Sequence, residues 1–319
     1  MQFEDDGAAR LLLRDADADT VLAEYVYAPT EPTLESPRPY ALLRSAAGAE
    51  ASAYRPGDHV WHKGLSLALP VVGGENFWGG PTYVHGEGYV QLANNGSQVH
   101  RSFLVPPTRR GPRSPAPDGR AEGDARVTES LDWIAEDERV VLTERRTLHA
   151  RRLDAATWAL SWESMLRNET DDTLGFGSPT SKGRENAGYA GIFWRGPSAW
   201  TGGEIVGPDG PVGDAARGAA GPWLAFVDPS RATGVLMLDT GLTVTEHGNP
   251  WFARSEEYAG LNPAPFFYDE TALPPGETLV LSAVVVIGDA DIARWAEAAA
   301  AFAADARADS DSDSEETPA

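Results

Sequence analysis

The sequence predicts an all-β protein, a large antiparallel β-sandwich with one C-terminal helix. Short segments in which apolar and polar side chains alternate recur along most of the chain, and clusters of Gly, Pro, Asp and Asn separate them. Only one segment, near the C-terminus, has the three- and four-residue apolar spacing of a helix. Because strands and helices do not alternate, a many-stranded sandwich is favoured over a parallel sheet covered by helices.

The predicted strands follow one another at short intervals. Residues 11–14 and 21–27 flank the acidic sequence DADAD, which is typical of a hairpin loop. Residues 126–135 and 139–149 are joined by EDE and form the clearest hairpin. The remaining strands are predicted at residues 39–44, 49–54, 65–72, 157–167, 191–194, 223–227, 234–238 and 278–287.

The single helix is predicted over residues 291–306, where apolar side chains recur every three or four positions. Residues 106–124 and 202–221 are rich in Pro and Gly and are predicted to be long loops. Strands continue across both loops, so residues 1–306 are expected to form a single domain. Residues 307–319 are strongly acidic and are predicted to be a disordered tail.

Composition excludes several classes of protein. The net charge of −22, without any basic stripe, argues against nucleic acid or an anionic membrane as a partner. The absence of cysteine excludes disulfides, thiolate metal sites and a cysteine nucleophile. No stretch approaches the roughly 20 apolar residues of a membrane span, and acidic residues stand where a signal peptide would be basic. We therefore expect a cytoplasmic protein.

Residues 55–103 concentrate side chains suited to a polar ligand, because they hold four of the six histidines together with Trp and Asn among glycines. Within this stretch, DHVWHKG contains Asp58, His59 and His62. In a regular strand the two histidines would face opposite sides, so only a bent backbone brings them together. Two interpretations stay open: the histidines are hydrogen-bonded independently of each other, or they bind a metal. The spacing between His59 and His62 differs from that of the HExxH motif of zinc proteases.

Three further clusters combine polar and aromatic side chains. They are NFWGGP (residues 76–81), GSPTSKGRENAGY (residues 177–189) and EHGNPWFAR (residues 246–254). A tryptophan ring offers a flat apolar face to a sugar, and Asn, His and Arg can bind its hydroxyl groups. Ordinary packing is the alternative for Trp78, and a salt bridge to Glu256 or Glu257 is the alternative for Arg254. No GxSxG elbow supports serine hydrolase chemistry.

Several segments taken together resemble the soluble PmoA-like family, a bacterial domain of unknown function labelled methane oxygenase PmoA. They are DHVWHKGL, NFWGG, QVHRSF, GSPTSKGRENAGY, HGNPWFAR and LPPGETLVL, and the resemblance covers the chain from about Tyr40 to Ile287. The family pattern implies roles for Asp58, His59, His62 and Lys63, and for the later Val99, His100 and Arg101. Relatives often carry a second Asp-His where this chain has Asp239 and Thr240. Methane monooxygenase function is rejected, because the membrane subunit needs several spans.

The chain is more distantly similar to the galactose-mutarotase-like supersandwich proteins. The similarity lies in the strand WALSWESMLRNETDD, which ends in Asn, and in the closing Pro-Gly-Glu at residues 275–277. It implies a supersandwich fold. Mutarotases use a histidine acid and a carboxylate base, and their NHxYF segment should fall near residues 177–189, where this chain has no histidine. An ordinary aldose 1-epimerase is therefore not expected.

We expect the protein to bind a sugar or sugar derivative and to act on it by acid–base chemistry of histidine and carboxylate groups in carbohydrate catabolism. The expected acid–base residues are Asp58, His59, His62, His100, Glu246 and His247, and the expected ligand-binding residues are Asn76, Trp78, Arg184, Asn186, Asn249, Trp251 and Arg254. No cofactor is expected. Two alternatives stay open: a metal-dependent lyase or hydrolase acting on oxidised glycosides, with a divalent metal on His59, His62 and His247, and a non-catalytic carbohydrate-binding module. The oligomeric state stays open.

Overall fold

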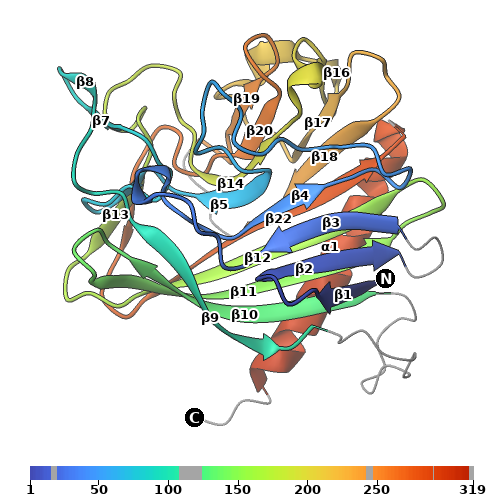
Figure 1. Cartoon of the computed structure of the whole chain (residues 1–319). Helices are drawn as coiled ribbons and strands as arrows, with labels where there is room; N and C mark the ends of the chain where they lie inside the picture. The colour runs from blue at the N-terminus through green and yellow to red at the C-terminus, as the bar shows by residue number, and fades with distance from the viewer. Residues whose placement is uncertain (16–19, 108–123, 242–246, 290, 316–319) are drawn as a thin grey trace.

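The computed structural model describes residues 1–15, 20–107, 124–241, 247–289 and 291–315, with side chains as far as residue 308. Two large antiparallel sheets face each other across the core (Figure 1). The first is eight-stranded, in the order β1 (Gln2–Asp5), β2 (Arg10–Asp15), β3 (Thr20–Val26), β4 (Tyr40–Leu43), β5 (Leu65–Ala68), β14 (Gly191–Arg195), β20 (Gly260–Pro263) and β19 (Trp251–Arg254).

The second sheet is nine-stranded, in the order β16 (Gly210–Pro211), β15 (Glu204–Gly207), β17 (Trp223–Val227), β18 (Gly234–Asp239), β22 (Thr278–Gly288), β12 (Trp158–Asn168), β11 (Val140–Arg152), β10 (Ala125–Ile134) and β9 (Ser97–Val105). Two small sheets complete the fold: β21 (Thr271–Leu273), β13 (Leu174–Gly177) and β6 (Val71–Val72), and the hairpin of β7 (Thr82–Val84) and β8 (Gly88–Val90). Three short 3-10 helices, η1 (Thr33–Glu35), η2 (Ser198–Trp200) and η3 (Gly213–Ala216), lie in the connections.

Strict alternation of side chains explains how the middle of the nine-stranded sheet is buried on both faces. In β22, Val285 and Ile287 point into the core between the sheets, whereas Val284 and Val286 point outward. Helix α1 (Ile292–Glu315) lies across the outward face (Figure 1). Trp295 and other apolar side chains of the helix pack against that face. The prediction of an antiparallel all-β sandwich with one C-terminal helix is therefore confirmed.

Several local predictions were wrong. Residues 49–54 form no strand and make isolated bridges such as Arg44 to Glu50. Residues 65–72 form two strands in different sheets, because the chain leaves the eight-stranded sheet at Pro70, which has no N–H to donate. The segment 202–221 is not a plain loop, since it contains β15, β16 and η3. Most of the predicted loop 106–124, residues 108–123, lies outside the described residues.

The acidic segment predicted to be disordered is helical over most of its length. Helix α1 continues past residue 306 to Glu315. Its sequence from 307 to 315 contains only Ala, Arg, Asp, Ser and Glu, and no Gly or Pro ends the helix there. In the part of the chain that the structure describes, no helix has both the length and the apolarity needed to cross a membrane.

Candidate functional site

The stretch 55–64, between β4 and β5, is fixed by buried charged side chains. Arg38 is 1% exposed and donates hydrogen bonds to the carbonyl oxygens of Trp61 (2.7 Å) and Trp78 (2.9 Å). Lys63 is fully buried, with its Nζ 3.7 Å from a carboxylate oxygen of Glu31 and 3.6 Å from one of Glu35. Burial lowers the pKa of Lys63 to about 8. These contacts hold the backbone in the bend that brings the two histidines together.

His59 and His62 lie side by side. Their rings are stacked, with centroids 4.7 Å apart and planes within 7° of each other. Asp58 joins His59 to the buried Arg195: its Oδ2 lies 2.9 Å from His59 Nδ1, and both its oxygens accept hydrogen bonds from Arg195 Nη2, at 2.8 and 2.9 Å. Burial alone would raise the pKa of Asp58, but the hydrogen bonds from His59 and Arg195 outweigh it and lower the pKa. Asp58 is therefore a carboxylate that fixes the orientation of His59.

The two rings of this pair have different exposure and different partners. His62 is 2% exposed and its Nδ1 lies 2.9 Å from Arg195 Nη1, which can only donate. His62 is therefore neutral and carries its proton on Nε2. Burial, and then the charges of His59 and Arg195, lower the pKa of His62 well below its ordinary value. The side chain of His59 is 40% exposed, so of the two it is the ring that a ligand can reach.

Strand register sets two arginines on either side of a glycine. Arg195 of β14 pairs with Gly260 of β20, and Gly260 pairs with Arg254 of β19. Directly paired residues point to the same face of a sheet, here the face opposite the core. The ring of Tyr258 occupies the space over the glycine, since a Cβ on Gly260 would lie 2.9 Å from Tyr258 Cε2.

The Tyr258 ring is the centre of this cluster. Its centroid lies 4.0 Å from the guanidinium carbon of Arg195 and 5.6 Å from that of Arg254. It also lies 6.0 Å from the His59 ring and 5.7 Å from the His62 ring. Burial raises the pKa of Tyr258 and lowers that of Arg254. We call Asp58, His59, His62, Arg195, Arg254 and Tyr258 the His–Arg cluster.

Aromatic side chains border the His–Arg cluster on the side of the β7–β8 hairpin. Trp78 contacts His62 edge-on at 5.6 Å and lies under Tyr189, whose ring centroid is 4.5 Å away. The Tyr189 hydroxyl lies 2.7 Å from that of Tyr89. Arg184 stacks on Tyr89 at 4.6 Å and donates a hydrogen bond to its hydroxyl. Tyr89 is 40% exposed, so these rings continue to the protein surface.

The amide of Asn76 builds a turn and is not free for a ligand. Asn76 is 1% exposed; its Oδ1 accepts from the backbone N–H groups of Trp78 and Gly79, and its Nδ2 donates to Gly80 and Thr82. The glycines that follow make room for Trp61, since a Cβ on Gly79 or Gly80 would lie 2.7 or 2.8 Å from that side chain. The prediction that this turn binds a ligand through Asn76 was wrong, because internal bonds use the whole amide.

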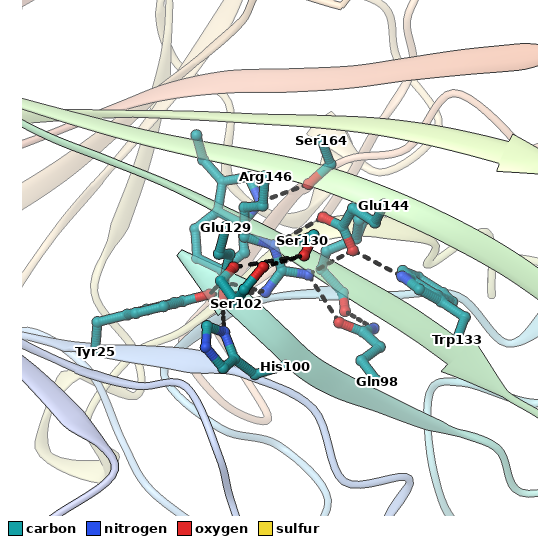
Figure 2. Close-up of polar contacts among 12 residues, drawn as sticks. Tyr25, Gln98, His100, Ser102, Glu129, Ser130, Trp133, Glu144, Arg146 and Ser164 are labelled. Carbon is teal, nitrogen blue, oxygen red and sulfur yellow. Dashed lines mark hydrogen bonds and ion pairs between the residues drawn. The ribbon is translucent and has the colours of Figure 1, made fainter. Parts of the chain in front are cut away.

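His100 belongs to a different cluster, inside the sandwich. Its Nδ1 lies 2.6 Å from Oε2 of Glu129, whose other oxygen accepts from the Tyr25 hydroxyl (Figure 2). Arg146 donates to Tyr25 and, through Nε and Nη2, to both oxygens of Glu144 at 2.8 Å (Figure 2). The ring of His100 contacts Tyr27 and Phe103, and no ring contact joins it to His59 or His62 among the described residues. We call Tyr25, Gln98, His100, Glu129, Trp133, Glu144 and Arg146 the core network.

The C-terminal cluster predicted from the sequence is dispersed. His247 is half exposed, with its Nδ1 2.9 Å from Asp269, and its ring packs on Tyr268. Trp251 is 1% exposed and donates to the Gly221 carbonyl, so it is not available for stacking on a sugar. Trp78 is likewise buried, at 5% exposure. Of the described residues of this segment, 247–254, only Arg254 joins the His–Arg cluster.

The remaining predicted site residues do not meet the cluster. Asn249 bonds the buried carboxyl of Asp239. Asn186 is exposed in a turn with a φ of 57° and makes no side-chain hydrogen bond to another described residue. Glu246 lies outside the described residues.

The histidines do not form the metal site that one hypothesis required. The planes of His59 and His62 are nearly parallel, so the lone pairs of their ring nitrogens do not converge on one point, and Nδ1 of His62 already accepts from Arg195. His247 is bound to Asp269 instead. Across residues 1–15, 20–107, 124–241, 247–289 and 291–315, no three His, Asp or Glu side chains are placed to hold a metal ion. The predicted ligand set of His59, His62 and His247 therefore does not fit a metal.

Sequence reasoning missed the residues that complete the site. Arg195 ends a strand and looks like an ordinary boundary residue, and Tyr258 follows two glutamates in a loop. Tyr89 and Tyr189 are 100 residues apart in the chain. The register of β14, β20 and β19 would have located Arg195, because it places Arg195, Gly260 and Arg254 in one row.

Solved structures resemble this chain only at low similarity. The crystal structure of the Slr1438 protein from Synechocystis sp. PCC 6803 matches with a TM-score of 0.37 and 12% identity, over 90% of this chain and 94% of that one. The galactosidase domain of the alpha-galactosidase-sucrose kinase AgaSK matches with a TM-score of 0.41 and 12% identity, over 91% of this chain and 42% of that one. A heparan sulfate lyase HepC mutant from Pedobacter heparinus matches with a TM-score of 0.40 and 7% identity, over 91% and 37%.

The chain thus spans well under half the length of those two enzymes, and likeness at this level says nothing of a ligand or an activity. No curated protein matches the chain in sequence. A family model does match, over residues 16–303, and its description is a family of unknown function, DUF6807. The expectation of a family of unknown function is confirmed at that level, while the PmoA-like name stays a prediction. With nearly its whole length matched, the chain belongs to DUF6807, a family of unknown function.

Proposed function

We propose that the His–Arg cluster binds a sugar or sugar derivative and that His59 transfers a proton to or from it. The observation that carries this proposal is the position of Asp58, which joins a buried arginine to a half-exposed histidine. A carboxylate on Nδ1 holds the proton there and leaves Nε2 of His59 as the basic nitrogen. No described residue bonds that nitrogen, so it is available to a ligand.

The surroundings of His59 suit a sugar. Trp61 meets the His59 ring edge-on at 5.3 Å and is partly exposed, so its indole can face the C–H groups of a sugar ring. The neighbouring guanidinium groups supply N–H donors for hydroxyl or carboxylate oxygens. His62 stays neutral and therefore adds no positive charge beside the His59 ring.

The experiment that tests the proposal follows carbon-bound protons of candidate sugars in D₂O by proton NMR. The panel holds aldohexoses, keto-sugars and hexuronates. Loss of a C–H signal reports enolisation, saturation transfer between anomers reports ring opening, and a new alkene signal reports elimination. Wild-type protein is expected to accelerate one of these processes. His59→Gln is expected to slow it by about 10²–10⁴-fold, the range typical of a positioned acid–base histidine.

His85→Gln is the matched control, because His85 is exposed and lies outside the cluster. Its rate is expected to equal that of the wild type. A rate that survives His59→Gln would contradict the proposal. If a sugar of the panel binds but the protein accelerates none of these processes, the protein is a non-catalytic carbohydrate-binding module.

A further inference from the structure

We propose that the ligand of the His–Arg cluster carries a carboxylate group, held by Arg254 and Arg184, so that the substrate class is a sugar acid such as a hexuronate. This inference rests on the proposed function of the same site. It concerns recognition and is independent of which bond the protein changes.

The first support is a local reversal of charge. The chain carries a net charge of −22, yet Arg184, Arg195, Arg217 and Arg254 gather around the rings of Phe252, Tyr258 and Tyr89. Three of these arginines have carboxylate partners, namely Asp58, Asp214 and Glu257. Arg184 has none among the described residues and donates a hydrogen bond to the Tyr89 hydroxyl instead. The group as a whole therefore carries one positive charge without a partner.

The second support is unused hydrogen-bonding capacity. The Nε atoms of Arg195 and Arg254 are both buried and have no acceptor in the described part of the chain. Buried N–H groups without an acceptor are uncommon in folded proteins, because they lose their bonds to water and gain nothing in return. The only carboxylate on Arg254, that of Glu257, is 68% exposed, so a ligand can replace or join it.

Mutual repulsion among the arginines points in the same direction. Burial lowers the pKa of Arg254, and the charges of Arg217 and Arg184 lower it further. An anion placed between these groups relieves the repulsion. A guanidinium group bonds a planar carboxylate through two parallel N–H donors, and a single negative charge balances the single unpartnered cation. A phosphate, which carries up to two charges near neutral pH, would exceed that balance.

The test compares binding of matched acids and neutral sugars by isothermal titration calorimetry. The probes are glucuronate, galacturonate and mannuronate, the methyl ester of each, the parent hexoses, and glucose 6-phosphate. One hexuronate is expected to bind at least tenfold more tightly than its methyl ester and its parent hexose. Raising the salt concentration is expected to weaken the binding of the acid but not the binding of the ester.

Two variants assign the carboxylate to its partners. Arg184→Gln and Arg254→Gln are each expected to lower the affinity for the acid at least fivefold. The affinity for the ester is expected to stay unchanged. Arg184 is partly exposed, so its variant tests the inference even if Arg254→Gln fails to fold. Arg231→Gln is the control, since Arg231 is 65% exposed and paired with Glu204, away from the cluster.

The outcomes separate this inference from the proposed function. Equal affinity for an acid, its ester and its parent hexose would overturn the carboxylate inference and leave the sugar site standing. Preference for glucose 6-phosphate over every hexuronate would overturn it in favour of a phosphorylated ligand. Binding of no probe at all would overturn both proposals.

Discussion

In two regions of this protein, an arginine contacts a carboxylate and the same carboxylate contacts a histidine. In the His–Arg cluster, Arg195 bonds Asp58, and Asp58 bonds Nδ1 of His59 at 2.9 Å. In the core network, Arg146 lies 3.9 Å from Glu129, which bonds Nδ1 of His100 at 2.6 Å (Figure 2). Pairwise contacts alone therefore do not distinguish a functional site from a structural one.

The difference lies in what is left unbonded. The core network is saturated around its arginine: Arg146 also bonds Tyr25, Gln98 and Glu144, and Trp133 bonds the same glutamate. Neither Arg146 nor Glu144 has any exposed side-chain surface. The His–Arg cluster instead has a histidine that is 40% exposed and two buried arginine N–H groups without acceptors. Incomplete bonding next to solvent, rather than the type of residue, is what supports our proposal that the His–Arg cluster binds a ligand.

The largest effect is expected from a mutation that breaks the core network. Arg146→Met should lower the free energy of unfolding by about 3–5 kcal/mol, because it leaves Glu129 and Glu144 buried without their cation. Urea unfolding followed by tryptophan fluorescence measures it. Arg231→Met, which removes an exposed ion pair, should change stability by less than about 1 kcal/mol. A similar small loss for Arg146→Met would show that the core network is no more structural than a surface pair.

The next effect tests whether Tyr258 organises the His–Arg cluster. Gly260→Ala places a Cβ 2.9 Å from the Tyr258 ring and should displace it. We expect ligand affinity to fall about tenfold, which corresponds to about 1.4 kcal/mol, while the fold is kept. Gly74→Ala is the control, since a Cβ there meets nothing within 4 Å. Unchanged affinity in Gly260→Ala, measured by calorimetry, would remove Tyr258 from the site.

A third prediction concerns pH and His62. The pKa of His62 in the folded protein lies well below 6.5, its ordinary value. Below pH 6.5 the His62 side chain binds a proton in the unfolded chain but not in the folded protein, so the free energy of unfolding falls as the pH falls. Between pH 6.5 and 5.5, His62 alone should lower the free energy of unfolding by about 1 kcal/mol. His62→Gln should lose that part of the pH dependence, measured by urea unfolding at both pH values, and an identical slope in both proteins would contradict it.

The smallest expected effect concerns the exposed ion pair of the cluster. Glu257 is 68% exposed, so Glu257→Gln should change stability by less than about 0.5 kcal/mol. It also frees Arg254, so affinity for a carboxylate ligand should rise about two- to threefold. Affinity for the methyl ester should stay constant. A loss of acid affinity would show that Glu257 positions Arg254 for the ligand instead of competing with it.

Local periodicity was enough to predict the architecture. The alternation in residues 126–149 and 157–167 gave long strands in the right place, because each has one face in the core and the other under α1 or solvent. Periodicity failed for short or broken segments. Residues 65–72 look like one apolar strand, and only the tertiary structure shows that the chain changes sheets at Pro70.

The site was predictable only in part. The bend that joins His59 and His62 depends on Arg38 and Lys63, whose partners lie far from them in sequence. The sequence alone does not separate His100 from His59, and only the contact with Glu129, on the neighbouring strand, assigns His100 to the interior. Composition identifies which side chains are capable of chemistry. Pairing between distant strands decides which of them meet.

The position of β22 has a consequence for how the protein is made. This strand occupies the middle of the nine-stranded sheet, between β18 and β12, although it is the last strand along the described chain. At about 5–20 residues per second of translation, roughly 6–24 s pass between the synthesis of β12 and that of β22. Throughout that interval the edge of β12 lacks its partner, and once Asp239 has been made the edge of β18 lacks the same partner. The nascent chain therefore presents unpaired strand edges late in synthesis, when a chaperone that binds extended apolar segments would act on it.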